Sequence, residues 1–265
     1  MAYYAIPDVH GNLNGLIEAT ESVLKVIDLE KDTIVFLGDY IDRGENSLGV
    51  LNYLYNLQNT YGEHRIVCLL GNHDDMFLKF LNNPREINFL LNDYKLKTLK
   101  SFIGDYFALS DFILSYNYEI VDMITQEDYT FKIIEYIKKK YSKLLDWYSK
   151  LPLYLDKISE DNVLFIHAGI EEKVLGVDWK EYTTEEQMIW NYPPNYGYNP
   201  YGFSIVCGHV MVDEFWKFSE EPCYDIYVSG NHYYIDGASP FNKKLNILKI
   251  ENGIYTDFIT GKTLN

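Results

Sequence analysis

The sequence predicts an α/β fold with parallel strands, and three observations lead to this prediction. Apolar runs at residues 3–6, 33–37 and 66–70 have the length and composition of buried strands. Each run is followed by a polar loop and then by a segment with helical hydrophobic spacing. A length of 265 residues suits one α/β core with an insertion better than two full domains. We therefore expect residues 1–265 to form a single domain.

The elements of the first 80 residues alternate between strand and helix. After the strand at 3–6, apolar residues recur with helical spacing from Leu13 to Ile27, and after the strand at 33–37 they recur from Leu48 to Tyr55. The third strand, at 66–70, ends in another polar loop. Strands and helices that alternate in this way are typical of βαβ units, in which the strands are parallel.

Residues 82–160 differ in composition from the segments on either side. Glycine becomes scarce, and apolar residues follow helical spacing from Phe131 to Tyr148, until Leu151-Pro152 ends the pattern. We expect a mainly helical insertion here. Strand patterns return at 162–166, 204–207, 233–237 and 245–250, and a helix start is predicted at 183–187.

Charge and composition exclude several classes of protein. The net charge of −16 argues against stable nucleic-acid binding, because contact with a phosphate backbone requires clustered Lys and Arg. No apolar stretch is long enough to span a membrane, and the amino terminus lacks the basic region of a signal peptide. Three scattered cysteines do not form a disulfide framework. A cytoplasmic enzyme with no membrane partner is the expectation.

Five predicted strands end in loops that carry acidic, amide or imidazole side chains. In chain order these side chains are Asp8 and His10; Asp39, Asp42 and Arg43; Asn72, His73 and Asp74; His167; and His209. Each loop alone is also explained by a turn, a helix cap or a buried histidine. If the strands bring the loops together, however, six oxygen and nitrogen ligands converge, and burying them without a cation is costly. The set therefore predicts a metal site.

These motifs resemble a known family. Asp8-x-His10-Gly11, Gly38-Asp39-x-x-Asp42-Arg43-Gly44, Gly71-Asn72-His73-Asp74, His167-Ala168-Gly169 and Gly208-His209 are similar to the signature set of the phosphoprotein phosphatase branch of the calcineurin-like metallophosphoesterases. The similarity is greatest to small bacterial and bacteriophage Ser/Thr phosphatases and to symmetrical diadenosine tetraphosphate hydrolases. It runs from residue 3 to about residue 240 and implies a four-layer αββα sandwich with mixed β-sheets.

The resemblance implies a centre of two divalent metal ions, with Asp39 shared between them. One ion is expected on Asp8, His10 and Asp39, and the other on Asp39, Asn72, His167 and His209. The family favours manganese, and the mixed oxygen and imidazole set also suits iron or zinc. In the implied mechanism, a water activated by both ions attacks phosphorus in line. Arg43 and Asn72 hold the phosphate, and His73, oriented by Asp42, protonates the leaving oxygen.

The substrate class remains open at this point. The main expectation is a phosphomonoesterase similar to Ser/Thr protein phosphatases, since Asp42-Arg43-Gly44 is intact. The alternative is a symmetrical diadenosine tetraphosphate hydrolase. It is favoured because many protein phosphatases use a second phosphate-binding arginine, and no arginine follows Arg85 in this sequence. That arginine is therefore missing, unless a lysine such as Lys180 replaces it. An inactive module that binds phosphorylated ligands is a further alternative. The expected partner is thus a phosphorylated protein or a nucleotide.

Three other features receive ordinary structural interpretations. His232 is expected in a loop, near the site at most. Asp236 is expected to serve the fold at the end of its strand. The aromatic loop with Tyr192, Tyr196 and Tyr198 is expected to pack on the surface, with contact to a base or phosphopeptide as the alternative.

Overall fold

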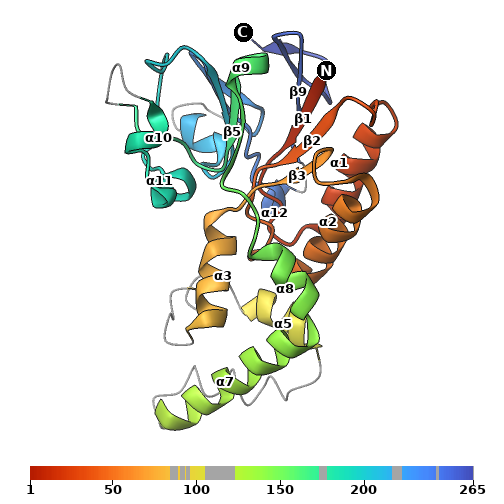
Figure 1. Cartoon of the computed structure of the whole chain (residues 1–265), viewed down its shortest axis with the longest axis vertical. Coiled ribbons are helices and arrows are strands. Elements are labelled where there is room, and N and C mark those ends of the chain that lie inside the picture. The colour runs from red at the N-terminus through yellow and green to blue at the C-terminus, as the bar shows by residue number, and fades with distance from the viewer. Residues whose placement is uncertain are drawn as a thin grey trace.

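The computed structural model describes residues 1–83, 89, 93, 96–104, 123–172, 178–216, 223–242 and 245–264. Two mixed β-sheets lie face to face in it, and helices cover their outer faces (Figure 1). The predicted four-layer sandwich with mixed sheets is confirmed.

The first sheet contains six strands in the order β11-β10-β9-β1-β2-β3. Its parallel half consists of β1 (Ala2–Ile6), β2 (Thr33–Phe36) and β3 (Ile66–Cys68), with Ala5 opposite Val35 and Val35 opposite Val67. Its antiparallel half consists of β9 (Leu248–Glu251), β10 (Ile254–Asp257) and β11 (Thr263–Leu264). The three predicted parallel strands are therefore adjacent, so the loops that follow them lie at the same end of the sheet, where the strands have their carboxyl ends.

The second sheet contains five strands in the order β4-β5-β6-β8-β7. These strands are β4 (Tyr154–Lys157), β5 (Val163–Ile166), β6 (Ser204–Cys207), β7 (Tyr227–Ser229) and β8 (His232–Tyr234). β5, β6 and β8 are parallel to one another, while β4 and β7 are antiparallel edge strands. The loops after β5 and β6 therefore also lie together, at the carboxyl ends of these strands.

Side-chain alternation along the strands builds the layers. On β1, Tyr3 and Ala5 point between the two sheets, where they join Phe165 of β5, while Tyr4 and Ile6 face the helices. Every residue of β1, β2, β3 and β5 is buried, so both faces of the sheets are covered at these strands.

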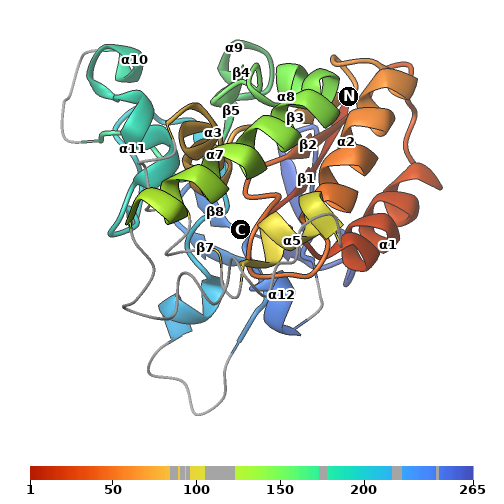
Figure 2. The same ribbon diagram turned by 90° about the horizontal axis from the view of Figure 1, so that it is seen from below.

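Helices complete the outer layers. α1 (Leu13–Leu24) and α2 (Ser47–Tyr61) cover the first sheet, and α10 (Trp179–Tyr182) and α11 (Glu185–Trp190) lie against the second (Figure 2). Asn12 and Asn46 cap α1 and α2 by accepting backbone N–H bonds. Thr184 and Gln187 form a capping box at the predicted start of α11.

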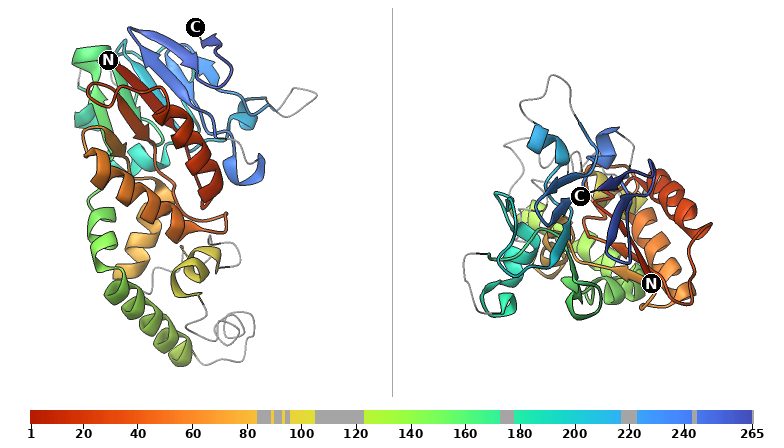
Figure 3. Two further views of the ribbon diagram at one scale, coloured as in Figure 1. Left: turned by 90° about the vertical axis from the view of Figure 1, so that its right-hand side faces the viewer. Right: turned by 90° about the horizontal axis from the view of Figure 1, so that it is seen from above.

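A helical segment extends from one end of the sheets (Figures 1 and 3). It contains α3 (Asn72–Asn82), α5 (Lys97–Ile103), α7 (Met123–Lys140) and α8 (Ser142–Tyr148). The stretch 82–160, expected to be a mainly helical insertion, also contains β4, a short edge strand of partly buried residues that the sequence did not predict and that is followed by α9 (Ile158–Asp161). A four-residue edge strand has too few residues to show a period. Residues 84–88, 90–92, 94–95 and 105–122 of this stretch lie outside the described residues.

The remaining short elements are the 3₁₀ helix η3 (Val212–Trp216) and α12 (Ser239–Asn242). In the described ranges, no helix has the length and apolar character needed to cross a lipid bilayer. The cytoplasmic location, the absence of nucleic-acid and membrane partners and the single-domain organisation stay predictions.

Candidate metal centre

All five polar loops converge at the carboxyl ends of the parallel strands. Hydrogen bonds join the loops of the two sheets. The ring Nδ1 of His167 lies 2.9 Å from the carbonyl oxygen of Leu37, and the backbone N–H of His209 donates to Asp8 Oδ1 at 3.1 Å. The structure therefore brings the six predicted metal ligands into one buried cluster, with only His209 partly exposed.

Asp39 lies at the centre of this cluster. Its Oδ2 is 3.6 Å from His10 Nε2, which is also 3.9 Å from Asp8 Oδ2. Its Oδ1 is 3.6 Å from His167 Nε2. The carboxylate thus faces one group of possible ligands with each oxygen, as a ligand shared by two ions requires.

The second group is organised by the side chain of Asn72. Its Oδ1 lies 2.9 Å from His167 Nε2 and 3.0 Å from His209 Nδ1. Asn72 is the first residue of α3, so the turn from β3 into that helix fixes its position. Asn72, His167 and His209 come from three different strand ends but meet at one point.

The backbone at the site is tightly constrained. A Cβ on Gly38 would lie 2.6 Å from Gly71 N, and one on Gly208 would lie 2.0 Å from Asp8 Oδ1. Nine non-glycine residues among those described have positive φ, and five of them are predicted site residues: His10, Asp39, Asp42, Arg43 and His209. Positive φ is costly for such residues and is concentrated at functional sites.

The buried carboxyl groups of the cluster require compensating positive charge. Burial raises the pKa of Asp8 well above its usual range, and the nearby charges of Asp236 and Asp39 raise it further. Burial also raises the pKa of Asp39, and only positive charge beside it, such as that of a protonated His167 ring, lowers this pKa below its usual value. Acidic groups packed this closely need positive charge beside them, and bound cations supply it.

The histidines divide into two kinds. Burial lowers the pKa values of His10, His167 and His209, the last to about 3, so their rings are neutral at pH 7 and each keeps a lone pair for a metal. Within the described part of the chain, the buried Nε2 of His10 has no hydrogen-bond partner. Neutral imidazoles, carboxylates and an amide oxygen fit divalent manganese, iron or zinc.

His73 behaves differently. Burial lowers its pKa, but the charge of Asp39 and the hydrogen bond and charge of Asp42 outweigh burial and raise it. Its Nδ1 lies 2.7 Å from Asp42 Oδ2, and its Nε2 lies 3.3 Å from Arg43 Nη2. The ring nitrogens of His10 and His73 and a carboxylate oxygen of Asp39 also lie within 4.8 Å of one another. Because Asp42 occupies Nδ1 and favours the protonated ring, His73 is better suited to donate a proton than to bind metal.

Comparison with known families agrees with this geometry. The sequence model of the calcineurin-like phosphoesterases matches residues 1–230. The chain belongs to the calcineurin-like phosphoesterase family. The family implies a binuclear divalent metal centre, and the His and Asp groups above are its candidate ligands in this phosphoesterase.

Individual relatives are more distant. The chain is similar to the symmetrical bis(5'-nucleosyl)-tetraphosphatase of Wigglesworthia glossinidia brevipalpis, with 30% identity over 177 residues, or 65% of this chain and 46% of that protein. The protein of the same name from Pseudomonas syringae is 38% identical over 76 residues, or 28% of this chain and 23% of that protein. The chain thus spans less than half the length of these relatives. A crystal structure provisionally named a diadenosine tetraphosphatase shares the fold, with a TM-score of 0.53, 15% identity and coverage of 99% of this chain and 91% of that one.

Two acidic residues of this calcineurin-like phosphoesterase have contacts that the sequence did not predict. Asp74 is fully buried and accepts hydrogen bonds from the backbone N–H groups of Asp39, Tyr40 and Gly71. Asp74 therefore ties the loop after β2 to the start of α3. Its position three residues after Gly71 could have indicated this role, because an acidic side chain at that position of a helix accepts a hydrogen bond from the backbone N–H of the N-cap residue.

The second acidic residue is Asp236. Its Oδ1 accepts from the backbone N–H of Ala238 at 2.9 Å, which agrees with a role in the fold. Its other oxygen is buried and has no hydrogen-bond partner among the described residues. Since its charge also raises the pKa of Asp8, Asp236 belongs to the surroundings of the metal cluster.

Lys180 does not replace the missing phosphate-binding arginine. Its ammonium group pairs with Asp156 at 2.5 Å and lies over the rings of Tyr154 and Trp179, on the outer side of the second sheet. The sequence could not exclude it, because position along the chain does not show which neighbour a lysine meets.

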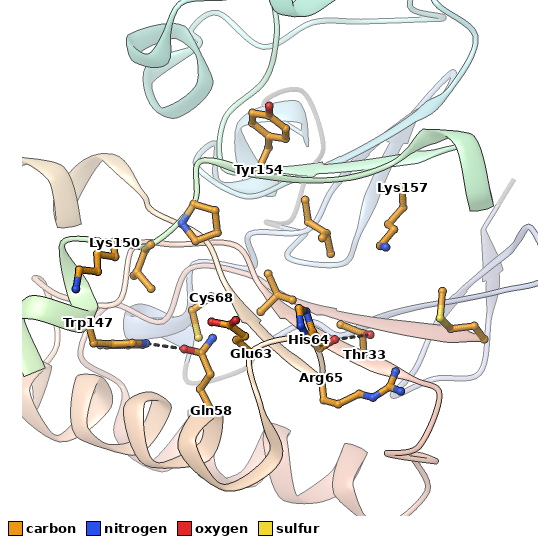
Figure 4. Close-up of a pocket in the computed structure, with 15 residues that line it drawn as sticks. Thr33, Gln58, Glu63, His64, Arg65, Cys68, Trp147, Lys150, Tyr154 and Lys157 are labelled. Carbon is orange, nitrogen blue, oxygen red and sulfur yellow. Dashed lines mark hydrogen bonds between the residues drawn. The ribbon is translucent and has the colours of Figure 1, made fainter.

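A cavity of about 740 Å³ lies elsewhere, between the edge strands β3 and β4. Figure 4 shows Trp147 and Gln58 on one side of it and Tyr154 and Lys157 on the other, with the Trp147 indole donating to Gln58 at 2.6 Å. None of the predicted metal ligands lines this cavity. The candidate site is therefore the buried cluster and not the cavity.

His232 is also placed differently from the expectation. It is a buried residue of β8, not a loop residue, and its Nε2 lies 2.6 Å from Glu172 Oε1. Its Nδ1 faces the carbonyl oxygens of Gly197 and Ser229. Because acceptors surround both ring nitrogens, the protonated ring is favoured. Burial lowers the pKa of His232, but the hydrogen bond and charge of Glu172 outweigh it and raise the pKa.

We expect this pair to stabilise the protein more near pH 6 than near pH 9. A raised folded-state pKa gives a contribution that is complete below the unfolded-state value, about 6.5, and is lost as pH rises through the folded-state value. His232→Gln should therefore destabilise the protein by about 1–3 kcal/mol near pH 6 and by less near pH 9. Urea unfolding of both proteins at each pH measures this difference. An equal destabilisation at both pH values would contradict a charged pair.

Proposed function

We propose that this chain is a metal-dependent phosphoester hydrolase that cleaves dinucleoside polyphosphates symmetrically. The proposal of metal-dependent hydrolysis rests on one observation: the carboxylate of Asp39 lies between two groups of buried ligands, each of which includes a neutral imidazole. The names of the relatives support the substrate class and favour it over the Ser/Thr phosphatase-like reading expected from the sequence. Since the chain spans less than half of those relatives, the substrate remains a proposal.

Asp8, His10 and Asp39 would hold one divalent cation, and Asp39, Asn72, His167 and His209 the other. Such a pair supplies an activated water and neutralises charge on the phosphoryl group. The lowered pKa values of the three histidines keep their rings neutral, so each ring has a lone pair for a metal. The protein thus holds its ligands in the protonation states that binding requires.

Arg43 and His73 would act on the phosphate. The guanidinium nitrogen Nη2 and the imidazole Nε2 lie 3.3 Å apart, beside the shared carboxylate. When His73 is protonated, both groups are donors: the guanidinium of Arg43 would hold a non-bridging phosphate oxygen, and the Nε2 proton of His73 would face the leaving oxygen. Asn72 would hold a second oxygen. Asp42 keeps the proton of His73 available for the leaving oxygen.

An exposed aromatic ring beside the cluster supports a nucleotide substrate. Trp190 is 41% exposed, and its ring centroid lies 6.1 Å from that of His209 at an angle of 83°. Tyr192, two residues later, is 61% exposed. Exposed aromatic faces stack on nucleobases, with gains of about 1–3 kcal/mol per base.

The function is tested by comparing substrates with manganese present and after chelation. We expect diadenosine tetraphosphate to give two molecules of ADP, with kcat/KM above that for a phosphoserine peptide and with no turnover after chelation. Trp190→Ala should raise KM for the dinucleotide about tenfold, which corresponds to a loss of about 1.4 kcal/mol of binding free energy. The KM for nitrophenyl phosphate should stay nearly unchanged. Tyr61→Ala, on the exposed end of α2, is the control for loss of a surface aromatic residue. Preference for the peptide would contradict the nucleotide assignment.

A Ser/Thr phosphatase-like phosphomonoesterase is the second candidate. The intact Asp42-Arg43-Gly44 loop favours it, because many relatives that hydrolyse diadenosine tetraphosphate depart from this motif, whereas here Asp42 contacts His73 directly. The same substrate comparison separates the two candidates. The inactive binding module is disfavoured because every predicted ligand and the proton donor are present.

A further inference from the structure

The helical segment contacts the proton-donating pair through Thr98 of α5. Thr98 is fully buried, and its hydroxyl donates to Asp42 Oδ1 at 2.6 Å. The other oxygen of this carboxylate, Oδ2, lies 2.7 Å from His73 Nδ1. One carboxylate oxygen of Asp42 therefore contacts the histidine, and the other accepts a hydrogen bond from a residue 56 positions away in the chain.

The hydroxyl of Thr98 has a complete set of partners. It accepts from the backbone N–H of Asp42 at 3.0 Å, and Ser47 Oγ lies 3.0 Å away. A hydroxyl has one proton to give and two lone pairs to accept with. Since the proton goes to Asp42 Oδ1, the lone pairs serve Asp42 N–H and Ser47 O–H. The direction of the Thr98 bond is thereby fixed.

The backbone around Thr98 is also held in place. Asp93 accepts hydrogen bonds from the N–H groups of Thr98 at 2.9 Å and Leu99 at 3.2 Å. Leu96, at the start of α5, makes no side-chain cap, so Asp93 provides the cap instead. The apolar side of α5, with Leu99 and Phe102, packs in the core beside Phe77. Thr98 is therefore presented to Asp42 by a well-supported helix.

We propose that Thr98 is a positioning residue for the hydrolytic site: it fixes the plane of the Asp42 carboxylate and through it the His73 ring. The inference rests on the proposed function and assigns a role to the helical segment. The terminal torsion of an aspartate is broad, so a single contact to His73 leaves the carboxylate free to rotate. With Oδ1 held, the ring stays aimed at the leaving oxygen. Misplacement by about 1 Å is enough to cost roughly 100-fold in rate.

The test uses Thr98→Val, which keeps the shape of the side chain and removes the hydroxyl. Turnover is measured on a series of aryl phosphates whose leaving phenols increase in pKa, with saturating manganese. We expect kcat for phenyl phosphate to fall about 10–100-fold and kcat for dinitrophenyl phosphate to fall less than about threefold, because only a poor leaving group needs the proton. Thr98→Ser should restore wild-type behaviour. Thr98→Cys, whose thiol is a weak donor, should be intermediate and serves if the valine variant does not fold.

Ser101→Ala is the matched control. Ser101 lies on the same helix and accepts from the backbone N–H of Leu48 at 2.7 Å, so its loss also removes a bond between α5 and α2. We expect it to retain the wild-type dependence on the leaving group. In a His73→Asn background, Thr98→Val should cause no further selective loss, because both changes act on one proton transfer. Bound metal, measured by elemental analysis, should equal that of wild type in both Thr98→Val and Ser101→Ala.

The outcomes separate this role from the proposed function. A wild-type protein that binds metal but hydrolyses no phosphoester contradicts the proposed function and the role together. An active wild type with an equal loss for all leaving groups in Thr98→Val, or with the same selective loss in Ser101→Ala, contradicts the positioning role alone.

Discussion

Replacing Asp39 with asparagine is expected to lower hydrolysis by about 10³-fold or more, since a metal centre contributes several kcal/mol to the transition state and each 1.36 kcal/mol is tenfold in rate. Asp39 is the only carboxylate whose two oxygens face both groups of ligands in the described site. Asparagine keeps its size but has a single oxygen. Activity, bound manganese and the rise in Tm on adding manganese should all decrease together.

Asp75→Asn is the control for this change. Asp75 lies on α3 close to the site, but its carboxylate pairs with Lys79 at 2.7 Å and takes no part in the metal cluster. It should retain metal and activity. A fully active Asp39→Asn protein, or one that still binds two equivalents of metal, would rule out Asp39 as the shared ligand.

Replacing His73 with asparagine is expected to slow hydrolysis of an alkyl phosphate by about 10²–10⁴-fold and that of nitrophenyl phosphate much less. Asp39 and Asp42 raise the pKa of His73, so the ring enters the reaction with a proton to give. An alkoxide leaving group needs that proton, whereas nitrophenolate leaves without it. Steady-state kcat for both substrates measures the difference.

His64→Asn is the control for removing an imidazole. His64 is exposed in the turn before β3, and its side chain is not part of the cluster. It should leave both rates unchanged. Equal losses on the two substrates in His73→Asn would show that His73 binds the phosphate or supports the metals and does not act as the acid.

The sequence allowed the site to be predicted because its residues occupy fixed places relative to strands. A polar residue directly after a buried strand must lie at the carboxyl end of that strand, so Asp8, Asp39 and His167 could be placed at one end of the sheets without coordinates. The glycines beside them are explained by the same contacts. A side chain at Gly38 or Gly208 would overlap the neighbouring loop.

Elements without a local pattern could not be predicted in this way. β4 is a strand because β5 offers it an edge, and its four residues are all partly buried. His232 was expected in a loop because Asn231 precedes it, but pairing of β8 with β6 and β7 made it a strand residue. Such elements depend on partners that are distant in sequence.

By itself, the sequence determined which side chains could meet in the candidate metal centre, because strand and turn patterns are local and repeat at short intervals. Only the tertiary structure decided which residues support buried side chains and loops. Thr98 donates a hydrogen bond to Asp42, Asp74 accepts one from the backbone of Asp39, and Glu172 contacts His232. The physical reason is that a hydrogen bond between residues far apart in the chain depends on how helices and sheets pack. No periodicity in the chain records that packing.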